Sequence, residues 1–574
     1  MPVYQLREIQ QNTEELLTQL EAEIRECSEV GSCYANKVKK FMAANGIWHL
    51  KELDYYWREV FEEFLSHEVK PSSYRKYIKA FDRLKQHSVQ AELRLIGRQG
   101  LIRPKFDNQM LFLLYHPNPD VVRKYNDSTK KKDLLWDFSV SAPEQMKRQI
   151  FRTLHRILES EDGYEINRIR LIELKKIYDY CIKEKVTDIE KLELFQIEKI
   201  KRVLQNEPVL KKEIDIIDYI RETLFLESKE IRWNVNVWYM KRFHLQKERL
   251  NAANPVKRIS FLEVSNQKNR ELLKKYIRYN LGLTDLSVSS ICNEFRYVRN
   301  FLTNLQPDKD VCTLTNQQIN WNLLKVEKKS IKAESYNDII LSILHFFQFL
   351  RAHEYILEIP FQKDYYLKKE IAQHHDRSIE NDIQLQLLRN LHRFPEELRL
   401  MYLHLWTLGL RISEVCTLKG DAYYLRGRDA WIKIYQIKLR TFKKIPIPDA
   451  LYQLMQIYIQ RKGIRPDEYV FQNQKGGAFR SGTFRKKMLD CCTAYGIQNG
   501  EYIFRSHDFR HGVATQLYNN GTSLQSVRDY LGHEYDEMTL QYVDYMPKRL
   551  DKENETFFDL PGNSLAGYLK EGKK

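Results

Sequence analysis

Apolar residues recur at helical spacing through most of the chain up to about residue 420. The segment LKELDYYWREVFEEFLSHE, residues 50–68, places one apolar stripe along a helix: Leu50, Leu53, Trp57, Val60 and Phe64. From residue 431 the period falls to two, and WIKIYQI and KKIPIP are predicted to pair as strands around a turn at 439–442. Helical spacing then returns at 449–460, 483–495, 512–518, 523–531 and 537–545. We expect a mainly α-helical protein with a small β-hairpin or sheet in its last third.

One helical arrangement recurs along the chain. Residues 34–65, 164–204 and 286–350 each contain an amphipathic helix, a short link and a second helix. This recurrence predicts a small helical bundle that is used up to three times. Amphipathic helical hairpins resemble one another in any case, so unrelated bundles are the alternative explanation.

The composition predicts several folded domains and favours a polyanionic partner. A chain of 574 residues is too long for one hydrophobic core, and 43% hydrophobic with 30% charged residues suits folded domains with a highly charged surface. The formal net charge of +16 gives affinity for nucleic acid a physical basis. An ordinary basic protein would have a similar composition, so charge alone does not decide the partner.

The sequence also predicts a cytoplasmic protein. Its first residues lack the apolar stretch of a signal peptide, and no run of about 18 apolar residues could cross a membrane. The eight cysteines are scattered and form no CxxC pair. We therefore expect reduced thiols rather than a disulfide or zinc framework.

Six residues in the last third supply the groups that can break a phosphodiester bond without a metal ion. They lie in TLGLRISEVCTL, QIKLRTFKKIPIP, HDFRHGVATQLYNNG and YLGHEYDEMTLQYV, and are Arg411, Lys438, His507, Arg510, His533 and Tyr542. The arginines would neutralise the nonbridging oxygens, the tyrosine would attack phosphorus, and a cationic acid would protonate the leaving oxygen. Because an unperturbed tyrosine has a pKa near 10, it needs nearby cations to activate it.

Two of these motifs have a different possible meaning. His507 and His511 are four residues apart and could instead bind zinc, but residue 508 is Asp where an HExxH motif has Glu. Arg411 could simply form a surface pair with Glu414.

The lysine and the tyrosine each have competitors nearby. Lys438 is expected at the end of the first strand of the hairpin, and Lys443 and Lys444 follow on the second strand. Tyr542 has the better position relative to His533, while Tyr545 lies one helical turn further on and is the alternative nucleophile.

A basic helix is a candidate for DNA contact. The segment FRSGTFRKKMLDCC is predicted to open a helix at Ser481 or Gly482, which brings Arg480, Arg485 and Lys486 close together. Such a helix could lie against a duplex. A solvated basic helix face explains the same pattern equally well.

The motifs resemble those of the tyrosine recombinase (phage integrase) family. The first family box, Gly-Leu-Arg-x-Ser-Glu-x-x-x-Leu, is matched from Gly409 to Leu418, and the His-x-x-Arg-His box is matched by HDFRH. LGHEYDEMTLQY fits the Leu-Gly-His and Thr-x-x-Tyr pattern. The resemblance covers roughly residues 379–545 and extends more weakly over 265–360. With its long N-terminal extension, the chain resembles the recombinases that transposons encode.

This resemblance implies a mechanism and a set of partners. Tyr542 would form a 3′-phosphotyrosyl bond, and a free 5′-hydroxyl would later reverse the attack, with no cofactor, metal ion or ATP. Double-stranded DNA would be the substrate, and four protomers would hold two DNA sites, with or without accessory recombinases. The last residues, 550–574, would dock on a neighbouring protomer.

The resemblance also implies an order of domains. These are a helical extension, a second helical extension, a helical core-binding (SAM-like) DNA-binding domain and a mixed α+β catalytic domain with a tail, at 1–160, 161–262, 263–372 and 373–574. Two other functions share parts of the pattern: DNA relaxation of the type IB topoisomerase kind, and DNA binding without catalysis. The six filled positions speak against the second of these, and the LGH and HxxRH contexts favour recombination over relaxation.

Overall fold

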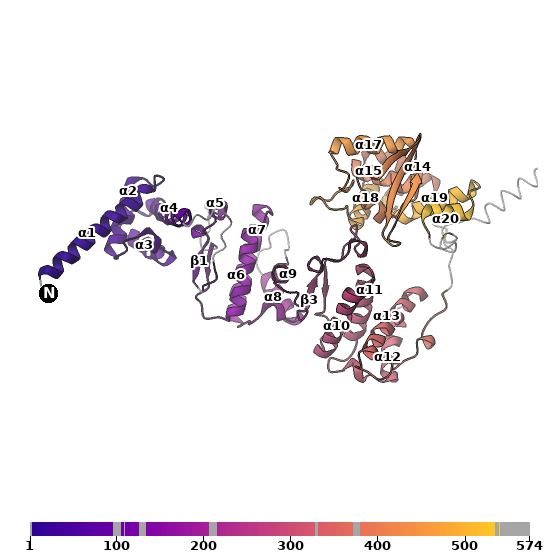
Figure 1. The fold of residues 1–574 in the computed structure, drawn as a ribbon, viewed down its shortest axis with the longest axis horizontal. Coiled ribbons are helices and arrows are strands. Elements are labelled where there is room, and N and C mark those ends of the chain that lie inside the picture. Colours follow the sequence, from indigo (N-terminus) through magenta and orange to yellow (C-terminus); the bar gives the residue numbers. More distant parts are fainter. Residues whose placement is uncertain are drawn as a thin grey trace, which may run out of the picture. The chain divides into compact units, whose positions relative to one another are not determined.

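The computed structural model describes residues 3–95, 105–107, 109–125, 134–205, 215–327, 331–370, 379–533 and 539. The chain forms two compact units, Met1–Arg242 and Phe243–Lys574. Most of the described residues are helical, and the strands are short (Figure 1). This confirms the mainly α-helical prediction. Among the described residues, no helix is long and apolar enough to cross a membrane.

The first unit contains nine described α-helices and three short strands. The helices are α1 (Val3–Glu26), α2 (Ser32–Ala44), α3 (Tyr55–Glu68), α4 (Pro71–Leu95), α5 (Pro119–Tyr125), α6 (Glu144–Leu158), α7 (Tyr164–Lys183), α8 (Leu194–Gln205) and α9 (Ile216–Leu226). The strands β1 (Met110–Phe112) and β2 (Leu135–Asp137) pair antiparallel, and β3 is Val237–Tyr239. The sequence pattern did not predict these strands, because three residues are too few to show a period of two.

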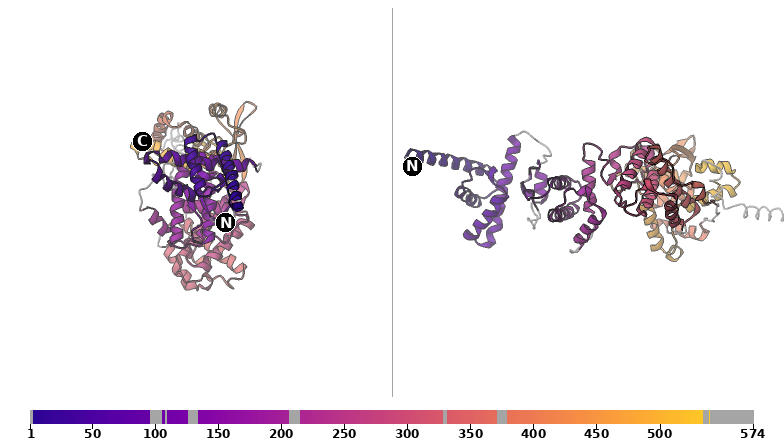
Figure 2. Two further views of the ribbon diagram at one scale, coloured as in Figure 1. Left: turned by 90° about the vertical axis from the view of Figure 1, so that its left-hand side faces the viewer. Right: turned by 90° about the horizontal axis from the view of Figure 1, so that it is seen from below.

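The apolar stripe predicted at residues 50–68 lies in the core of the first unit. Leu50 and Leu53 are fully buried, and the other members of the stripe pack against the same cluster as α2 and α4. The side chain of Asp54 accepts a hydrogen bond from the backbone N–H of Trp57 at 3.0 Å and so starts α3. α1 can be followed from the N-terminal label in Figures 1 and 2.

The second unit begins with a helical bundle and continues into a mixed α+β region. The bundle helices are α10 (Gln267–Leu283), α11 (Val288–Thr303), α12 (Asn316–Glu327) and α13 (Ala333–Ala352), and the short β4 is Arg258–Ser260. The later helices are α14 (Asn381–Asn390), α15 (Glu396–Leu408), α16 (Ile412–Cys416), α17 (Asp449–Lys462), α18 (Ser481–Ala494), α19 (Ser506–Asn519) and α20 (Leu524–Leu531). Of the helix predicted at 537–545, only Thr539 lies within the described residues, and it is helical.

A three-stranded antiparallel sheet lies between α16 and α17 in the chain. Its strands are β5 (Tyr423–Arg426), β6 (Asp429–Gln436) and β7 (Thr441–Pro446), in the order β5-β6-β7. The hairpin was predicted correctly, but its turn covers 437–440 rather than 439–442, and β5 was missed. One face of the hairpin is buried, and it carries two polar side chains inward: Gln436 and Lys443.

Candidate active site

Arg411 stands at a sharp turn between α15 and α16. Gly409 ends α15 in left-handed backbone with φ of 60°. A Cβ atom at this position would lie 3.1 Å from Cβ of Val513 in α19, so the turn needs glycine for space as well as for conformation. Arg411 then forms the N-cap of α16, with its side chain 17% exposed. The turn therefore holds this guanidinium at the edge of a packed region.

Arg510 in α19 is fully buried, and the fold fixes its guanidinium. Its Nη1 donates to the carbonyl oxygen of Gly409 at 3.0 Å, and its Nη2 donates to the carbonyl of Leu531 at 2.8 Å. These carbonyls belong to the C-terminal ends of α15 and α20, where carbonyl groups lack helical partners and the helix dipole favours a cation. Two helix ends thus place Arg510 without any ligand.

His533 follows the end of α20 and contacts Arg510 directly. Its Nε2 lies 2.8 Å from Nη2 of Arg510 and accepts a hydrogen bond, so its ring proton is on Nδ1, which lies 2.9 Å from Oγ1 of Thr539. Burial and then the neighbouring cations, Arg510 first, lower the pKa of His533 to about 2. The imidazole is therefore neutral near pH 7. In this arrangement it can orient Arg510 and accept a hydrogen bond, but it cannot supply a proton as a cation.

Glu414 joins the two halves of the site. Its carboxylate accepts from the Arg411 Nη1 at 3.0 Å and from the Arg411 backbone N–H at 2.9 Å, and it lies 3.8 Å from Nζ of Lys443. The side chain is 2% exposed. Burial acts to raise the pKa of Glu414, but Lys443, Arg510 and Arg411 together hold it below its usual value. Glu414 is thus a buried anion that compensates the surrounding positive charges.

Lys443 reaches the same place from the inner face of β7. Its Nζ donates to the carbonyl of Leu531 at 3.1 Å, which also accepts from Arg510. Burial lowers the pKa of Lys443 to about 8; Arg510 and Arg411 act in the same direction, and Glu414 opposes them. The competitor of Lys438 is therefore part of the buried cluster.

Lys438 has a different environment. It is exposed in the turn between β6 and β7. Together with Arg411 and Gly532 it lines a hollow of about 910 Å³, whose other side is formed by residues 284–290 at the α10–α11 connection. The two assigned cations thus face one open space that the bundle and the sheet share.

Gly532 closes α20 next to the hairpin. It has a φ of 68°, and a Cβ atom there would lie 2.1 Å from Nε2 of Gln436. The amide of Gln436, buried on β6, donates to the carbonyl of Gly532 at 3.2 Å. The glycine of the LGH motif therefore lets the hairpin approach the end of α20.

His507 lies exposed in the first turn of α19, and a positive charge on its ring would act with Arg510, Arg411 and Lys443 to lower the pKa of His533. Its ring centroid is 5.5 Å from that of the buried His511. Among the described residues, no third His, Cys, Asp or Glu joins this pair in a group that could hold a metal ion.

The proposed nucleophile lies outside the described residues. This applies to Tyr542, to its alternative Tyr545 and to the tail at 550–574. The last described residue before them is Thr539, which is fully buried and contacts His533.

The three DNA-contact candidates do not have the same role in the structure. Arg480 is half-buried, and its Nη1 donates to the carbonyl of Ala252 at 3.1 Å, which fixes the segment before the bundle to the start of α18. Arg485 and Lys486 are exposed on α18 and form no ion pair with any described residue. Only these two are placed like surface contacts.

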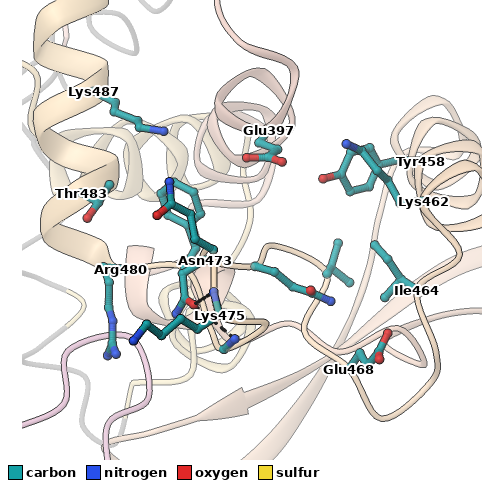
Figure 3. A pocket seen from close by; sticks show the side chains of 15 residues that line it. Glu397, Tyr458, Lys462, Ile464, Glu468, Asn473, Lys475, Arg480, Thr483 and Lys487 are labelled. Carbon is teal, nitrogen blue, oxygen red and sulfur yellow. Dashed lines mark hydrogen bonds between the residues drawn. The ribbon is translucent and has the colours of Figure 1, made fainter. Parts of the chain in front are cut away.

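A second hollow, of about 970 Å³, lies beside α18 (Figure 3). Thr483 and Lys487 line it from α18 and Arg480 lines it from the N-cap of that helix. Lys475 extends beside them from a turn that the side chain of Asn473 organises. The carboxylates of Glu397 and Glu468 lie on other parts of its wall. The five described members of the candidate site do not line this hollow.

Comparisons with known proteins concern the same part of the chain. The model of the phage integrase family matches residues 377–549, which include every member of the candidate site. Residues 377–549 are a phage integrase domain. Transposase B from transposon Tn554 of Staphylococcus aureus is 28% identical over 349 residues, which are 58% of this chain and 54% of the transposase. The chain therefore spans about half the length of that relative.

Other relatives of the phage integrase domain carry similar names. A tyrosine recombinase of Pseudothermotoga lettingae is 26% identical over 282 residues, 47% of this chain and 93% of the relative. Among solved structures, the Tn1549 transposon integrase in complex with a circular intermediate DNA aligns with a TM-score of 0.40 at 18% identity, over 50% of this chain and 99% of that chain.

Sequence reasoning treated two residues of the buried cluster as secondary. Glu414 was considered as a surface partner of Arg411, but it is buried and contacts both Arg411 and Lys443. Lys443 was only a competitor of Lys438, although the sequence pattern indicated its burial. It lies two residues before Ile445 on β7, which places both side chains on the inner face.

Proposed function

We propose that this protein is a site-specific DNA recombinase of the integrase or transposase kind, which cuts and rejoins DNA through a 3′-phosphotyrosyl intermediate. The observation that carries the proposal is the buried cluster around Arg510. Three cations and one anion are held there by helix ends and by a hairpin within a phage integrase domain. Such a preorganised set of charges suits the dianionic transition state of phosphoryl transfer.

In the proposed reaction, Arg411 and Arg510 bind the two nonbridging oxygens of the scissile phosphate. Arg510 would exchange its contact with His533 for one with phosphate, and Nε2 of His533, which is an acceptor, would then be available to the hydroxyl of the tyrosine. Oη of Tyr542 attacks phosphorus, the P–O5′ bond breaks, and the tyrosyl proton passes to a nearby base. His507 is the exposed imidazole proposed for that role.

The leaving O5′ needs a proton, and we assign Lys438 as its donor. Its place in the hairpin turn, lining the same hollow as Arg411, would bring its ammonium to DNA bound there. In a substrate with sulfur at the 5′-bridging position, the 5′-thiolate is a good leaving group and departs without this proton. Such a substrate should restore cleavage by Lys438→Ala but not by Arg510→Ala. If this substrate instead restores cleavage by Lys443→Ala, the proton donor is Lys443.

Trapping of the covalent complex tests the proposal as a whole. The substrates are nicked duplexes that together cover the DNA on both sides of the gene that encodes this protein. Those that contain the cleavage site should form a covalent adduct with the wild type and with Tyr545→Phe. Tyr542→Phe should bind the same duplexes and form none, because it lacks the nucleophilic oxygen. An adduct at full yield with Tyr542→Phe would refute the assignment. EDTA should leave the yield unchanged, and ATP should not be needed.

The proposal extends to the other parts of the chain and to assembly. We assign 263–372 as the core-binding domain and 373–574 as the catalytic domain, with 1–160 and 161–262 as helical extensions. The expected active form is a homotetramer on two duplex DNA sites; a lambda integrase has been solved as a tetramer bound to a Holliday junction. Light scattering on paired sites, with and without residues 550–574, tests whether the tail is needed for this assembly.

A further inference from the structure

Three sets of helices along the chain share the same connection between their second and third helices, which we call the joint. A short 3₁₀ turn stands between the second and third helices of each set, as η1 (Leu50–Glu52), η4 (Ile189–Lys191) and η7 (Val311–Thr313). In each set the third helix begins five residues after the start of this turn, as α3, α8 and α12. We call the sets the first, second and third modules; they are α1–α4, α6–α9 and α10–α13.

The same hydrogen bond closes all three joints. A polar side chain of the module's first helix accepts from the backbone N–H of the first residue of the turn. Glu23 accepts from Leu50 at 2.8 Å, Gln149 accepts from Ile189 at 2.8 Å, and Asn269 accepts from Val311 at 2.9 Å. The contact is buried in the second and third modules and partly buried in the first. Its recurrence goes beyond what amphipathic helices share by their nature.

The surroundings of the joint recur as well. The first residue of the turn and the leucine that follows the turn are buried in all three modules. In the second and third modules, an aspartate precedes the turn and caps it: Asp188 accepts from the N–H of Glu190 at 3.0 Å and Asp310 from that of Cys312 at 2.9 Å. In the first module His49 takes this place, and its ring contacts Glu23 at 2.7 Å. The first module is thus built on the same plan as the module that adjoins the phage integrase domain.

Charge is strongly segregated in the first module. α2 and α4 together carry nine lysines and arginines and two acidic residues, whereas α1 and α3 carry three basic and ten acidic residues. α2 packs on α4, where the rings of Tyr34 and Tyr77 meet edge to face at 5.0 Å. The basic helices therefore lie side by side.

One side of α4 carries a stripe of basic residues at helical spacing: Arg75, Lys76, Lys79 and Arg83. The first three are exposed and form no ion pair within the described part of the chain. Arg83 donates to the backbone carbonyl of Glu29 at 2.9 Å, and it forms no ion pair with a carboxylate of the described residues. An uncompensated cationic stripe on a helix is suited to the phosphates of a duplex.

We propose that the first module is a second nucleic-acid contact of this protein, which binds the duplex backbone through the stripe on α4. Duplex DNA rather than an acidic protein is the partner, because the same module plan occurs beside a DNA-cutting domain; in this respect the inference rests on the proposed function. The contact adds phosphates to those that the second unit binds and carries no base recognition of its own.

The test uses the full-length chain and a fluorescent 60-bp duplex of random sequence. The stripe variant replaces Arg75, Lys76 and Lys79 with Gln, and the matched control replaces Arg25, Lys51 and Lys70, which are exposed in the same module but do not belong to the stripe. Both lose three positive charges. The stripe variant should flatten the slope of log affinity against log salt by up to about three units, at about 0.9 per phosphate contact, while the control should keep the wild-type slope.

Several outcomes separate this proposal from the recombinase assignment. An unchanged slope in the stripe variant, or an equal change in the control, would overturn the role of the first module even if covalent trapping succeeds. If trapping fails but the slope changes as expected, the contact stands and the recombinase assignment does not. Circular dichroism and thermal melting of both variants exclude unfolding as the cause of a lost contact.

Discussion

The candidate site has a buried half and an exposed half, and they differ in how they are positioned. Arg510, Glu414, Lys443 and His533 are each at most 9% exposed and hold one another through helix ends and a carboxylate. Lys438 and His507 are exposed, and no described contact fixes the ammonium of Lys438. In the proposed reaction, the fold therefore builds in advance the half that we assign to phosphate binding, whereas the half that we assign to proton transfer would need bound DNA for its final geometry.

The sharpest test of the buried half is Arg510→Ala. We expect cleavage of the trapping substrate to fall about 10²–10³-fold, the range for loss of one preorganised transition-state contact. DNA affinity should fall far less, because the contact strengthens as charge develops in the transition state. Single-turnover rates and anisotropy titrations measure the two quantities. Equal losses in rate and affinity would make Arg510 an ordinary backbone contact, and Arg411→Ala should behave in the same way.

Removal of the buried anion should cost folding stability rather than affinity. Glu414→Gln leaves three neighbouring cations without their carboxylate, and we expect the free energy of unfolding to fall by about 3 kcal/mol. The control is Glu396→Gln, which breaks an exposed pair with Arg461 and should cost less than about 1 kcal/mol. Urea denaturation of both variants gives the difference. Similar losses would show that burial of Glu414 adds nothing.

The buried lysine should give the protein a specific dependence on pH. Lys443 has a pKa of about 8 in the folded chain, whereas an unfolded lysine titrates near 10.5. Between these values the unfolded chain binds more protons, so this group makes the free energy of unfolding rise with pH from about 8 to about 10.5. Lys443→Arg stays charged throughout and should lack this rise of roughly 1–3 kcal/mol. Urea denaturation of both proteins at pH 7.5 and pH 9.5 measures this difference. If the free energy of unfolding changes by the same amount between these pH values in the wild type and in the variant, the assignment is contradicted.

Much of this architecture could be predicted from sequence because it depends on local patterns. Helical periodicity identified the bundles, and the period of two identified the β6–β7 hairpin. Gly409 and Gly532 marked the turns at which α15 and α20 end. The sequence motifs also selected Arg411, Arg510 and His533, which the fold brings into one cluster.

The rest depends on contacts between distant residues, which no local pattern reveals. The carbonyl of Leu531 receives both Lys443 and Arg510, from 88 and 21 residues away in the chain. Such convergence follows from packing of α19, α20 and the hairpin. The short strands of the first unit and β5 were missed for a related reason, because only their partners make them strands.

The smallest expected effect concerns the exposed surface of α18. Arg485 and Lys486 are solvent-exposed, whereas Arg480 is engaged with the carbonyl of Ala252. If α18 lies against the duplex, Arg485→Gln with Lys486→Gln should flatten the slope of log affinity against log salt by up to about two units, and single-turnover cleavage at saturating protein should be unchanged.

Arg480→Gln serves as the comparison in the same titrations. It should leave the salt slope close to that of the wild type, because its guanidinium holds the start of α18 to Ala252 instead of facing solvent. It should instead lower the melting temperature, since a partly buried hydrogen bond from a charged group is worth about 1.5–3 kcal/mol. An unchanged slope in the double variant would make Arg485 and Lys486 a solvated helix face. A large change of slope in Arg480→Gln would show that this arginine leaves Ala252 to bind DNA.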